Sequence, residues 1–176
     1  QAHSISIATE PRAPSGMAIG ALVLALLIFR FWLATVFPFT GDEAYFTIWG
    51  LKPDFGYYDH PPMVGWWLIA LTRLSMAEWV LRLPAVLLPL AIAAGIYGAL
   101  RRHDETRARY AALGYALVPV NVWNVFITTD TPLILFSFLS AAALYRALLK
   151  NSLAWYALSG VLFGMAFLSK YFAVLL

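Results

Sequence analysis

The sequence predicts an all-α integral membrane protein, built as a bundle of several spanning helices. Two observations carry this prediction. The 176-residue chain is 62% hydrophobic and only 12% charged, with a mean hydropathy of +0.75, and its long apolar runs alternate with short polar connections. Soluble domains are closer to half apolar and a quarter charged. The chain has no cysteine, which excludes disulfides, cysteine-bound zinc and thiol chemistry.

The long apolar runs predict five membrane spans, since a span needs about 20 apolar residues. Residues 1–16 are polar, contain two prolines and are expected to form a disordered cytoplasmic tail. The first apolar run is too long for the core of a cleavable signal peptide, and no small-residue cleavage site follows it. The predicted spans are residues 17–39, 79–100, 110–127, 133–149 and 154–176.

Both ends of the chain suggest that it continues further. It begins with Gln1 rather than Met, and it stops inside the apolar run "FAVLL". We therefore interpret residues 17–176 as the N-terminal part of a larger transmembrane domain.

The loop at 40–78 is the most unusual part of the sequence, because four of the nine acidic residues lie within its residues 41–67. A short helix is expected directly after Asp42 and Glu43, with both acids at the end where the helix dipole favours negative charge. The apolar run at 63–73 is too short to span a membrane. We expect it to lie at the interface, where Trp66 and Trp67 suit the headgroup level.

The basic residues orient the predicted spans. Seven Lys or Arg residues fall on one side of the membrane and three on the other. The positive-inside rule places the first group in the cytoplasm, so loop 40–78 and the turn "TTDTP" at 128–132 share the external face. The net charge of +3 could suggest nucleic acid, but the basic residues are too few and too scattered for that function.

The acids of this loop need a partner or a task, because a carboxylate near an apolar boundary is costly. Asp54 is most simply a solvated residue in the turn "KPDFG". That reading is weaker for the pair Asp42 and Glu43, and for "YYDHPP", where Tyr57 and Tyr58 precede an acid and an imidazole. Aromatic rings beside carboxylates suit carbohydrate, and a carboxylate can act as general base for an attacking hydroxyl.

Together, five segments resemble the N-terminal part of the GT-C fold glycosyltransferases that use polyprenyl-phosphate sugars. Within that fold the chain is most similar to the bacterial branch of the protein-mannosyltransferase-like superfamily, which also holds the lipid A aminoarabinose transferases. The similarity covers about Phe29 to Leu176, with the acidic pair, the D-H-P-P block and the D-T-P turn in the family's order. The segments are "GDEAYFTIW", "GYYDHPPMVGWWL", "RLPAVL", "TTDTPLILF" and "LSKYFAVLL".

The resemblance implies a membrane enzyme that moves a hexosyl or pentosyl group from an undecaprenyl- or dolichyl-type phosphate. It implies inversion at the anomeric carbon and an acceptor on the external face, either an envelope glycan, lipid A or protein. By resemblance, Asp42 is the catalytic carboxylate and Glu43 completes the catalytic motif. The expected location is the bacterial inner membrane, with the active site facing the periplasm or exterior. This chain alone need not be active.

The resemblance also assigns four substrate-binding residues besides the two tyrosines. Asp59 matches a second acid of the site, and Asp130 matches an acid of the second external loop. Lys170 matches a lysine that reaches the carrier phosphate. His60 stands where the aminoarabinose transferases have a lysine, and it contacts phosphate as a cation only when protonated. Those enzymes also carry an Arg–Tyr pair where this chain has Tyr45–Phe46, which argues against the same sugar.

The implied reaction is direct displacement at the sugar. Asp42 takes the proton of the acceptor hydroxyl while the sugar–phosphate bond breaks, and the site must stabilise the leaving phosphate. Lys170 and protonated His60 are the available cations. We expect Asp42, Asp59 and Asp130 to converge on one external cavity, with aromatic walls from Tyr57 or Tyr58. No cofactor is expected to be required, and a divalent metal at the acidic loop is left open.

Several of these charged residues also have simpler interpretations. Lys170 could extend its ammonium to the membrane interface. His60 could only hydrogen-bond Asp59 and shape the loop. Arg30 is expected to reach the interface or to face the bundle, and Arg82 is expected to anchor the chain at the interface.

Two other functions compete with glycosyl transfer. A transporter or flippase of a lipid-linked sugar would place ionisable residues along the middle of the spans, whereas these acids fall in loops on one face. Such a transporter would also continue as an inverted repeat of this first half. A structural membrane subunit without chemistry would leave "YYDHPP" and "TTDTP" unexplained.

Overall fold

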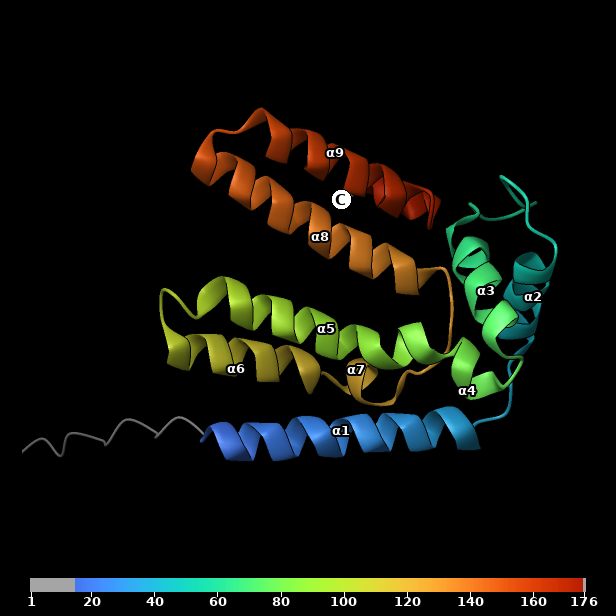
Figure 1. The fold of residues 1–176 in the computed structure, drawn as a ribbon, viewed down its shortest axis with the longest axis horizontal. Helices are drawn as coiled ribbons and strands as arrows, with labels where there is room; N and C mark the ends of the chain where they lie inside the picture. Colours follow the sequence, from blue (N-terminus) through green and yellow to red (C-terminus); the bar gives the residue numbers. More distant parts are fainter. Residues whose placement is uncertain (1–14, 176) are drawn as a thin grey trace, which may run out of the picture.

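The computed structural model describes residues 15–175, and the predicted tail therefore lies almost entirely outside the described residues. Every element in the described part is helical, which confirms the predicted fold class (Figure 1). The elements are α1 (Gly16–Val36), α2 (Gly41–Leu51), α3 (Met63–Leu74), α4 (Glu78–Leu81), α5 (Leu83–Leu100), α6 (Glu105–Ala116), α7 (Pro119–Trp123), α8 (Asp130–Lys150), α9 (Leu153–Phe167) and the 3₁₀ helix η1 (Tyr171–Leu175).

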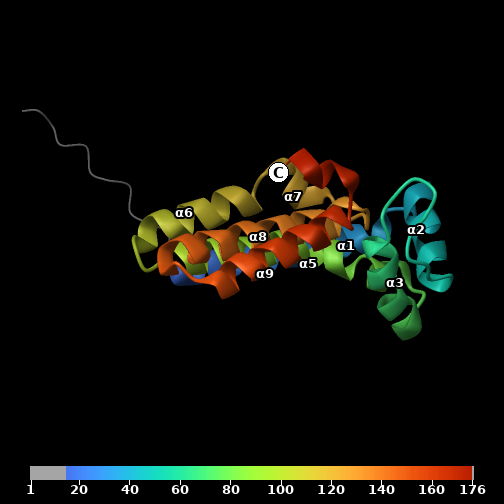
Figure 2. The same cartoon turned by 90° about the horizontal axis from the view of Figure 1, so that it is seen from above.

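The long helices lie side by side, and the short helices α2, α3 and α4 gather at one end of them (Figures 1 and 2). We call this the loop-rich end; it also holds the connection 124–129 between α7 and α8 and the end of α9. The connections 101–104 and 151–152 lie at the opposite end. The two loops that the charge distribution assigns to one face therefore occupy the same end of the bundle.

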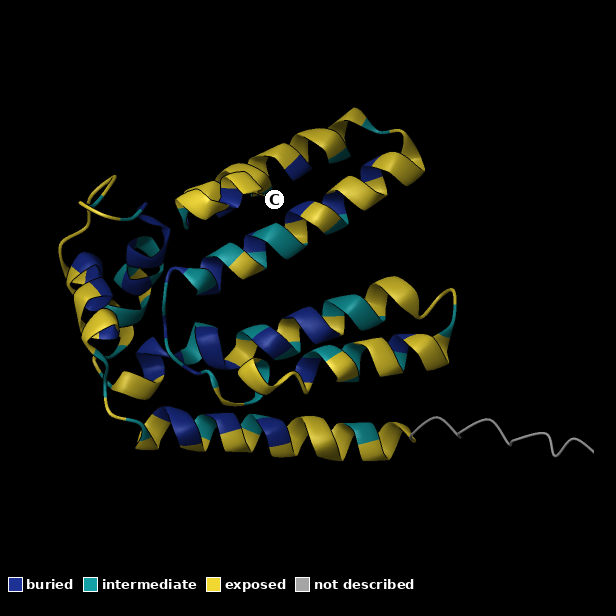
Figure 3. Cartoon of the chain, turned by 180° about the vertical axis from the view of Figure 1, so that it is seen from behind, coloured by how far each residue is buried: buried dark blue, intermediate teal, exposed yellow. Residues whose placement is uncertain are grey.

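Three described helices are long and apolar enough to cross a membrane: α1, the stretch Glu78–Leu100 that joins α4 to α5, and α8. Much of the surface of these helices is exposed (Figure 3). The exposed residues include large apolar ones, among them Leu24, Ile28 and Trp32 of α1. Lipid tails can cover such a surface, because they are as apolar as these side chains.

The predicted span at 110–127 is not one continuous helix. α6 begins five residues earlier than expected, because Asp104 caps it by accepting the backbone N–H of Arg107 at 2.9 Å. It ends at Ala116, and the short α7 and an extended segment follow. Pro119 explains the break, since proline has no N–H and disfavours helical geometry at the preceding Val118, which is extended.

Arg30 compensates for this break. Its buried guanidinium donates to the carbonyl oxygens of Asn121 and Asn124, which the broken helix leaves free, the latter at 2.8 Å. It also donates to Ala85 at 2.6 Å and to Val86 at 2.9 Å, in the first turn of α5. Of the two interpretations of Arg30, the bundle-facing one is therefore confirmed. The irregular backbone is tolerated because a buried side chain satisfies it.

The predicted helix over 154–176 is also shorter than expected. α9 ends at Phe167, and η1 follows after a short connection. The carbonyl oxygen of Leu168, just after α9, accepts the backbone N–H of Met63 at 3.1 Å. Earlier in the same helix, the Ser159 hydroxyl donates to the carbonyl of Ser140 at 3.0 Å, and Ser140 reciprocates at 2.9 Å. Such exchanges join helices that have no hydrophobic driving force between them in lipid.

Close helix packing at the loop-rich end depends on two glycines. A Cβ on Gly50 of α2 would lie 2.7 Å from the Cβ of Leu68 in α3, and one on Gly65 would lie 3.0 Å from the Cβ of Trp49. These approaches let Phe46 and Trp49 pack with Leu68 in the main core of this end. The interfacial helix expected at 63–73 is present as α3, and its depth in a membrane remains a prediction.

The orientation across the membrane can be tested with two single cysteines, because the chain has none of its own. Gly56 lies at the loop-rich end, where an added Cβ meets nothing within 4 Å, and the exposed His103 lies at the other end. Gly56→Cys and His103→Cys are expected to react with an impermeant maleimide from opposite sides of sealed vesicles. Labelling of both from one side would contradict this topology.

Candidate active site

The candidate site begins at the first turn of α2, which a reciprocal cap holds in place. The Thr40 hydroxyl accepts the backbone N–H of Glu43 at 3.3 Å, and Glu43 Oε2 accepts the Thr40 N–H at 3.1 Å. This capping box is encoded locally by the spacing T-x-x-E. It places Asp42 in the first helical turn, where the helix dipole favours an anion. Asp42 itself is exposed and makes no hydrogen bond or ion pair within residues 15–175.

Glu43 points the other way, into a fully buried ion pair with Arg82. Arg82 donates through Nε to Oε1 and through Nη2 to Oε2, both at 2.7 Å. Its remaining donors reach the carbonyl oxygens of Ala34 and Phe37 at 2.9 Å and of Pro38 at 3.0 Å. The expectation that Arg82 anchors the chain at the interface is therefore wrong, because its side chain is completely buried against Glu43.

The electrostatics of Glu43 favour its charged form. Burial alone raises the pKa of the Glu43 carboxyl. The hydrogen bond and charge of Arg82, together with the backbone N–H groups of Thr40 and Ile127, outweigh burial and lower the pKa below its ordinary 4.5. Glu43 is thus a carboxylate, as the pairing with a bidentate guanidinium requires.

The exposed face of α2 carries both Asp42 and a tyrosine that contacts Asp59. Asp42 and Tyr45 are three residues apart on the helix, so their side chains are neighbours on one face. The Tyr45 hydroxyl donates to Asp59 Oδ1 at 3.3 Å, and the Asp59 side chain is 43% exposed. Burial and the negative charge of Asp59 both raise the pKa of Tyr45, which keeps its hydroxyl a donor. Tyr45 therefore contacts Asp59 and lies on the same exposed helix face as Asp42.

The two predicted aromatic walls differ in their surroundings. Tyr57 lies flat on Trp49, with ring centroids 4.1 Å apart, and its hydroxyl donates to the carbonyls of Trp49 at 3.0 Å and Lys52 at 3.2 Å. Tyr58 is fully exposed, and His60 Nε2 lies 4.0 Å from Asp59 Oδ2. Tyr57 thus stabilises the fold of the loop, whereas the side chains of Tyr58 and His60 are accessible to a ligand.

Asp130 and Lys170 form the second part of the site. Lys170 Nζ donates to Asp130 Oδ1 at 2.7 Å across 40 residues of chain, with side chains 26% and 50% exposed respectively. Asp130 begins α8, three residues earlier than the sequence predicts, and Lys170 follows the end of α9. The pair is accessible, unlike the buried pair of Glu43, and an anionic ligand could compete for the ammonium.

Backbone contacts connect both parts of the site at the loop-rich end. The Ile127 N–H, three residues before Asp130, donates to Glu43 Oε1 at 3.3 Å. The N–H of Met63, shortly after Asp59, donates to the carbonyl oxygen of Leu168. The folded chain therefore gathers loop 40–78, the connection 124–129 and the end of α9 around one surface. Convergence of the three aspartates on a single cavity remains a prediction.

Two members of this site escaped the sequence interpretation. Arg82 could have been found from its chemistry, because a charged residue beside an apolar run in a low-charge chain calls for a partner. Tyr45 had a weaker signal, the i, i+3 spacing from Asp42 on a short helix. Within residues 15–175, no three His, Asp or Glu side chains group closely enough to hold a metal ion. The sequence left a divalent metal at the acidic loop open, and the arrangement of the described side chains adds no support for one.

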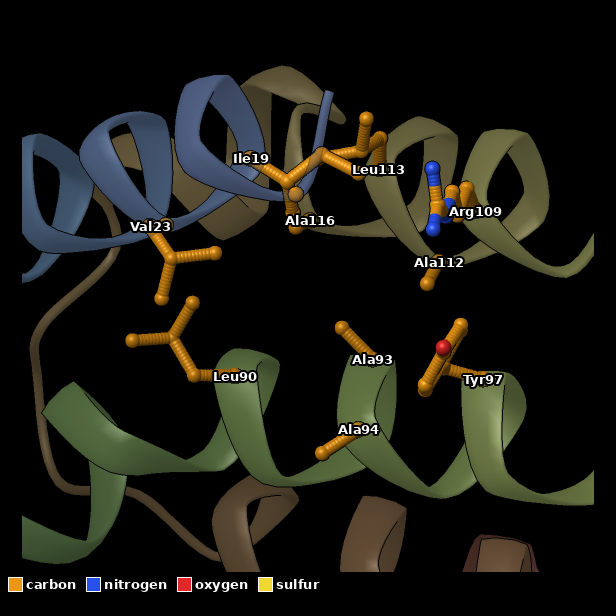
Figure 4. Close-up of a pocket in the computed structure, with 12 residues that line it drawn as sticks. Ile19, Val23, Leu90, Ala93, Ala94, Tyr97, Arg109, Ala112, Leu113 and Ala116 are labelled. Atoms are coloured by element: carbon orange, nitrogen blue, oxygen red, sulfur yellow. The ribbon is translucent and has the colours of Figure 1, made fainter. Parts of the chain in front are cut away.

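A cavity of about 380 Å³ lies far from these acids, between α1, α5 and α6 (Figure 4). Its walls are apolar, with Val23, Leu90 and Ala112 among them, and Tyr97 and Arg109 provide polar groups. It lies toward the end that holds the connection 101–104. Its lining contains no carboxylate, so the acid chemistry belongs to the loop-rich end.

Comparison with known proteins agrees with this helical membrane architecture. Residues 59–176, more than half of the chain, match the family model described as dolichyl-phosphate-mannose-protein mannosyltransferase. The chain belongs to this family of GT-C type membrane proteins.

One curated relative extends the similarity across loop 40–78. The chain is 30% identical over 159 residues to the lipid A galacturonosyltransferase RgtD of Rhizobium johnstonii. The aligned region covers 85% of this chain and 33% of the relative, so the chain spans about a third of that protein's length. The comparison with solved structures gave no significant match.

Proposed function

We propose that this chain forms the N-terminal part of a membrane glycosyltransferase that uses a polyprenyl-phosphate sugar as donor. The observation that carries the proposal is Asp42 at the start of α2, which is exposed and without a partner among residues 15–175, at the same end of the bundle as the Asp130–Lys170 pair. A base and a phosphate-binding cation on one surface are the two groups that displacement at a sugar phosphate requires. Family membership supports the same reaction class.

The proposed reaction is a single inverting displacement on the external face of the membrane. The acceptor hydroxyl oxygen forms a bond to the anomeric carbon and loses its proton to Asp42. The bond between that carbon and the phosphate oxygen breaks, and the polyprenyl phosphate leaves with the electron pair. Lys170 stabilises the leaving phosphate, since a charge-assisted hydrogen bond to an anion is roughly twice as strong as a neutral one.

The name of the relative suggests the particular substrates. That protein is a lipid A galacturonosyltransferase, and we propose lipid A or a related envelope lipid as the acceptor here. Tyr45 and Asp59, on the exposed face of α2, supply a hydroxyl and a carboxylate for sugar hydroxyl groups. Tyr45 lies three residues from Asp42 on one helix face, which suits a donor sugar held over the base.

Transport of a lipid-linked sugar fits the structure less well. Among the described residues, the charged side chain inside α1 is Arg30, and its guanidinium is buried and bonded to four backbone carbonyls. A transport path would need such groups to face a water-filled route instead. The accessible ionisable residues of loop 40–78 lie at one end, as surface chemistry requires.

The proposal is tested with full-length protein in membranes, supplied with radiolabelled polyprenyl-phosphate sugars and lipid A. The expected result is transfer of label to lipid A, with the product linkage inverted relative to the donor. Protein that folds but releases no sugar from galacturonosyl, mannosyl or aminoarabinosyl donors would contradict a glycosyltransferase.

The role of Lys170 gives a separate prediction. Lys170→Met keeps an apolar stem and removes the cation, and it is expected to weaken donor affinity about 10- to 100-fold, the scale of a hydrogen bond to a charged group. The KM for the donor in the same membrane assay measures the effect. Arg73→Met is the matched control, because Arg73 is an exposed cation at the same end without a side-chain partner in the described residues.

Asp130 provides the second arm of this experiment. If the carrier phosphate replaces Asp130 beside the ammonium, Asp130→Asn should leave donor affinity unchanged or tighter, because the competing anion is gone. A loss of affinity in Asp130→Asn equal to that in Lys170→Met would show that the ion pair acts as a structural unit instead.

A further inference from the structure

The most constrained group of atoms at the loop-rich end is the Arg82 guanidinium with its partners. It joins three separate stretches of chain: the end of α1, the first turn of α2 and the junction of α4 with α5. All of its contacts are at 2.7 to 3.0 Å, and neither Arg82 nor Glu43 has any exposed side-chain area. Breaking such a pair is strongly unfavourable, because it leaves one charge buried and uncompensated.

The Glu43 carboxylate has no capacity left for a substrate. Oε1 accepts from Arg82 Nε and from the N–H of Ile127, and Oε2 accepts from Arg82 Nη2 and from Thr40. A carboxylate offers about four acceptor positions, and here each oxygen already has at least two donors. Glu43 therefore does not act on a reacting atom in this arrangement.

The hydrogen bonds of Glu43 fix the orientation of the first turn of α2 about its helix axis. Successive residues of a helix lie about 100° apart around its axis. A Glu43 side chain held inward by two bonds to Arg82 leaves Asp42 on the outer face, next to Tyr45. The same carboxylate also holds Ile127, and with it the connection that leads to Asp130.

We propose that Glu43 and Arg82 are positioning residues, which hold the Asp42 carboxylate toward the substrates without touching them. This inference rests on the proposed function, since it concerns the base of that reaction. It assigns Glu43 a role other than the one its place in the catalytic motif suggests. It also gives Arg82 a part in turnover that the sequence does not indicate.

A double-mutant cycle in the full-length enzyme tests this inference, using Asp42→Asn, Glu43→Gln and the two together. Glu43→Gln should lower kcat about 10- to 100-fold with donor KM unchanged, since a misplacement of about 1 Å can cost a hundredfold. In the Asp42→Asn background the same change should have almost no further effect, because residues that act through one group are not additive.

The outcomes separate the two proposals. If Asp42→Asn does not lower turnover, the proposed function fails and the positioning role fails with it. If Asp42→Asn does lower turnover but Glu43→Gln lowers kcat by the same factor in both backgrounds, Glu43 acts independently of Asp42. That result would overturn the positioning role and leave the proposed function intact.

A milder pair of variants covers the case in which Glu43→Gln does not fold. Thr40→Ala removes a hydroxyl that donates to Glu43 Oε2 at 3.1 Å and caps α2, whereas Thr40→Ser keeps that hydroxyl. Thr40→Ala should lower kcat several-fold in the Asp42 enzyme, scarcely at all in the Asp42→Asn enzyme, and Thr40→Ser should restore it. Normal kcat in Thr40→Ala would mean that the cap and Glu43 contribute only to stability.

Discussion

Replacing Asp42 by asparagine is expected to lower turnover of the full-length enzyme by about two to four orders of magnitude, the usual contribution of a general base. Asparagine keeps the size and the place of Asp42 in the first turn of α2, but it cannot take a proton from the acceptor. Donor KM should change little, because the carrier phosphate is held by Lys170 on our proposal. The measurement is transfer of label from a polyprenyl-phosphate sugar at saturating donor.

Asp54→Asn is the matched control for this variant. Asp54 is an exposed acid in the same loop, and within the described part of the chain its side chain accepts only the N–H of Phe55, at 2.6 Å, which asparagine can also accept. Its turnover should equal that of the unmodified enzyme. Equal and mild losses in both variants would mean that the acidic loop provides surface charge and no base.

Removing Arg82 is expected to produce the largest loss of stability. Arg82→Met leaves the Glu43 carboxylate buried without its cation and frees three backbone carbonyls, and breaking a buried pair in this way costs about 3–5 kcal/mol. Thermal unfolding of the purified full-length protein in detergent measures the change. Arg73→Met, which removes an exposed arginine at the same end, should shift stability by no more than about 0.5 kcal/mol.

The double variant Glu43→Gln/Arg82→Met provides the internal test of this explanation. With both charges gone, no uncompensated ion is buried, so the double variant should be more stable than Arg82→Met alone. A double variant that loses the sum of both single losses would show that the charges do not act as a pair. Because the hydrogen bonds from Arg82 to three backbone carbonyls are still lost, the double variant should remain less stable than the unmodified protein.

The Glu43–Arg82 ion pair makes the stability of the folded protein depend on pH. The pKa of Glu43 in the folded protein lies below its ordinary 4.5, so the unfolded chain binds a proton more readily there. The contribution of the pair is therefore complete above a pH of 4.5 and is lost as the pH falls through the lower folded-state pKa. Arg82→Met should lose this part of the acid dependence.

The sequence by itself determined the class of the molecule and the local form of its site. An apolar fraction of 62% indicates that the long helices lie in lipid, and more Lys and Arg residues fall on one side of the predicted spans than on the other. The cap of Thr40 on Glu43 is equally local, because residues three apart meet in the first turn of any helix. The acids of the candidate site could likewise be identified from local sequence motifs.

The tertiary structure alone decided what those residues touch. Pro119 is visible in the sequence, but the carbonyls that the break at α7 leaves free are satisfied by Arg30, which lies about 90 residues away in the chain. Glu43 and Arg82 are 39 residues apart in the chain. The hydrophobic periodicity around either residue does not predict that the two side chains pair. Propensity and spacing describe neighbours along one helix, whereas a buried charge finds its partner only when the bundle packs. For that reason the sequence identifies the acidic pair, and only the folded bundle separates an exposed Asp42 from a buried, fully bonded Glu43.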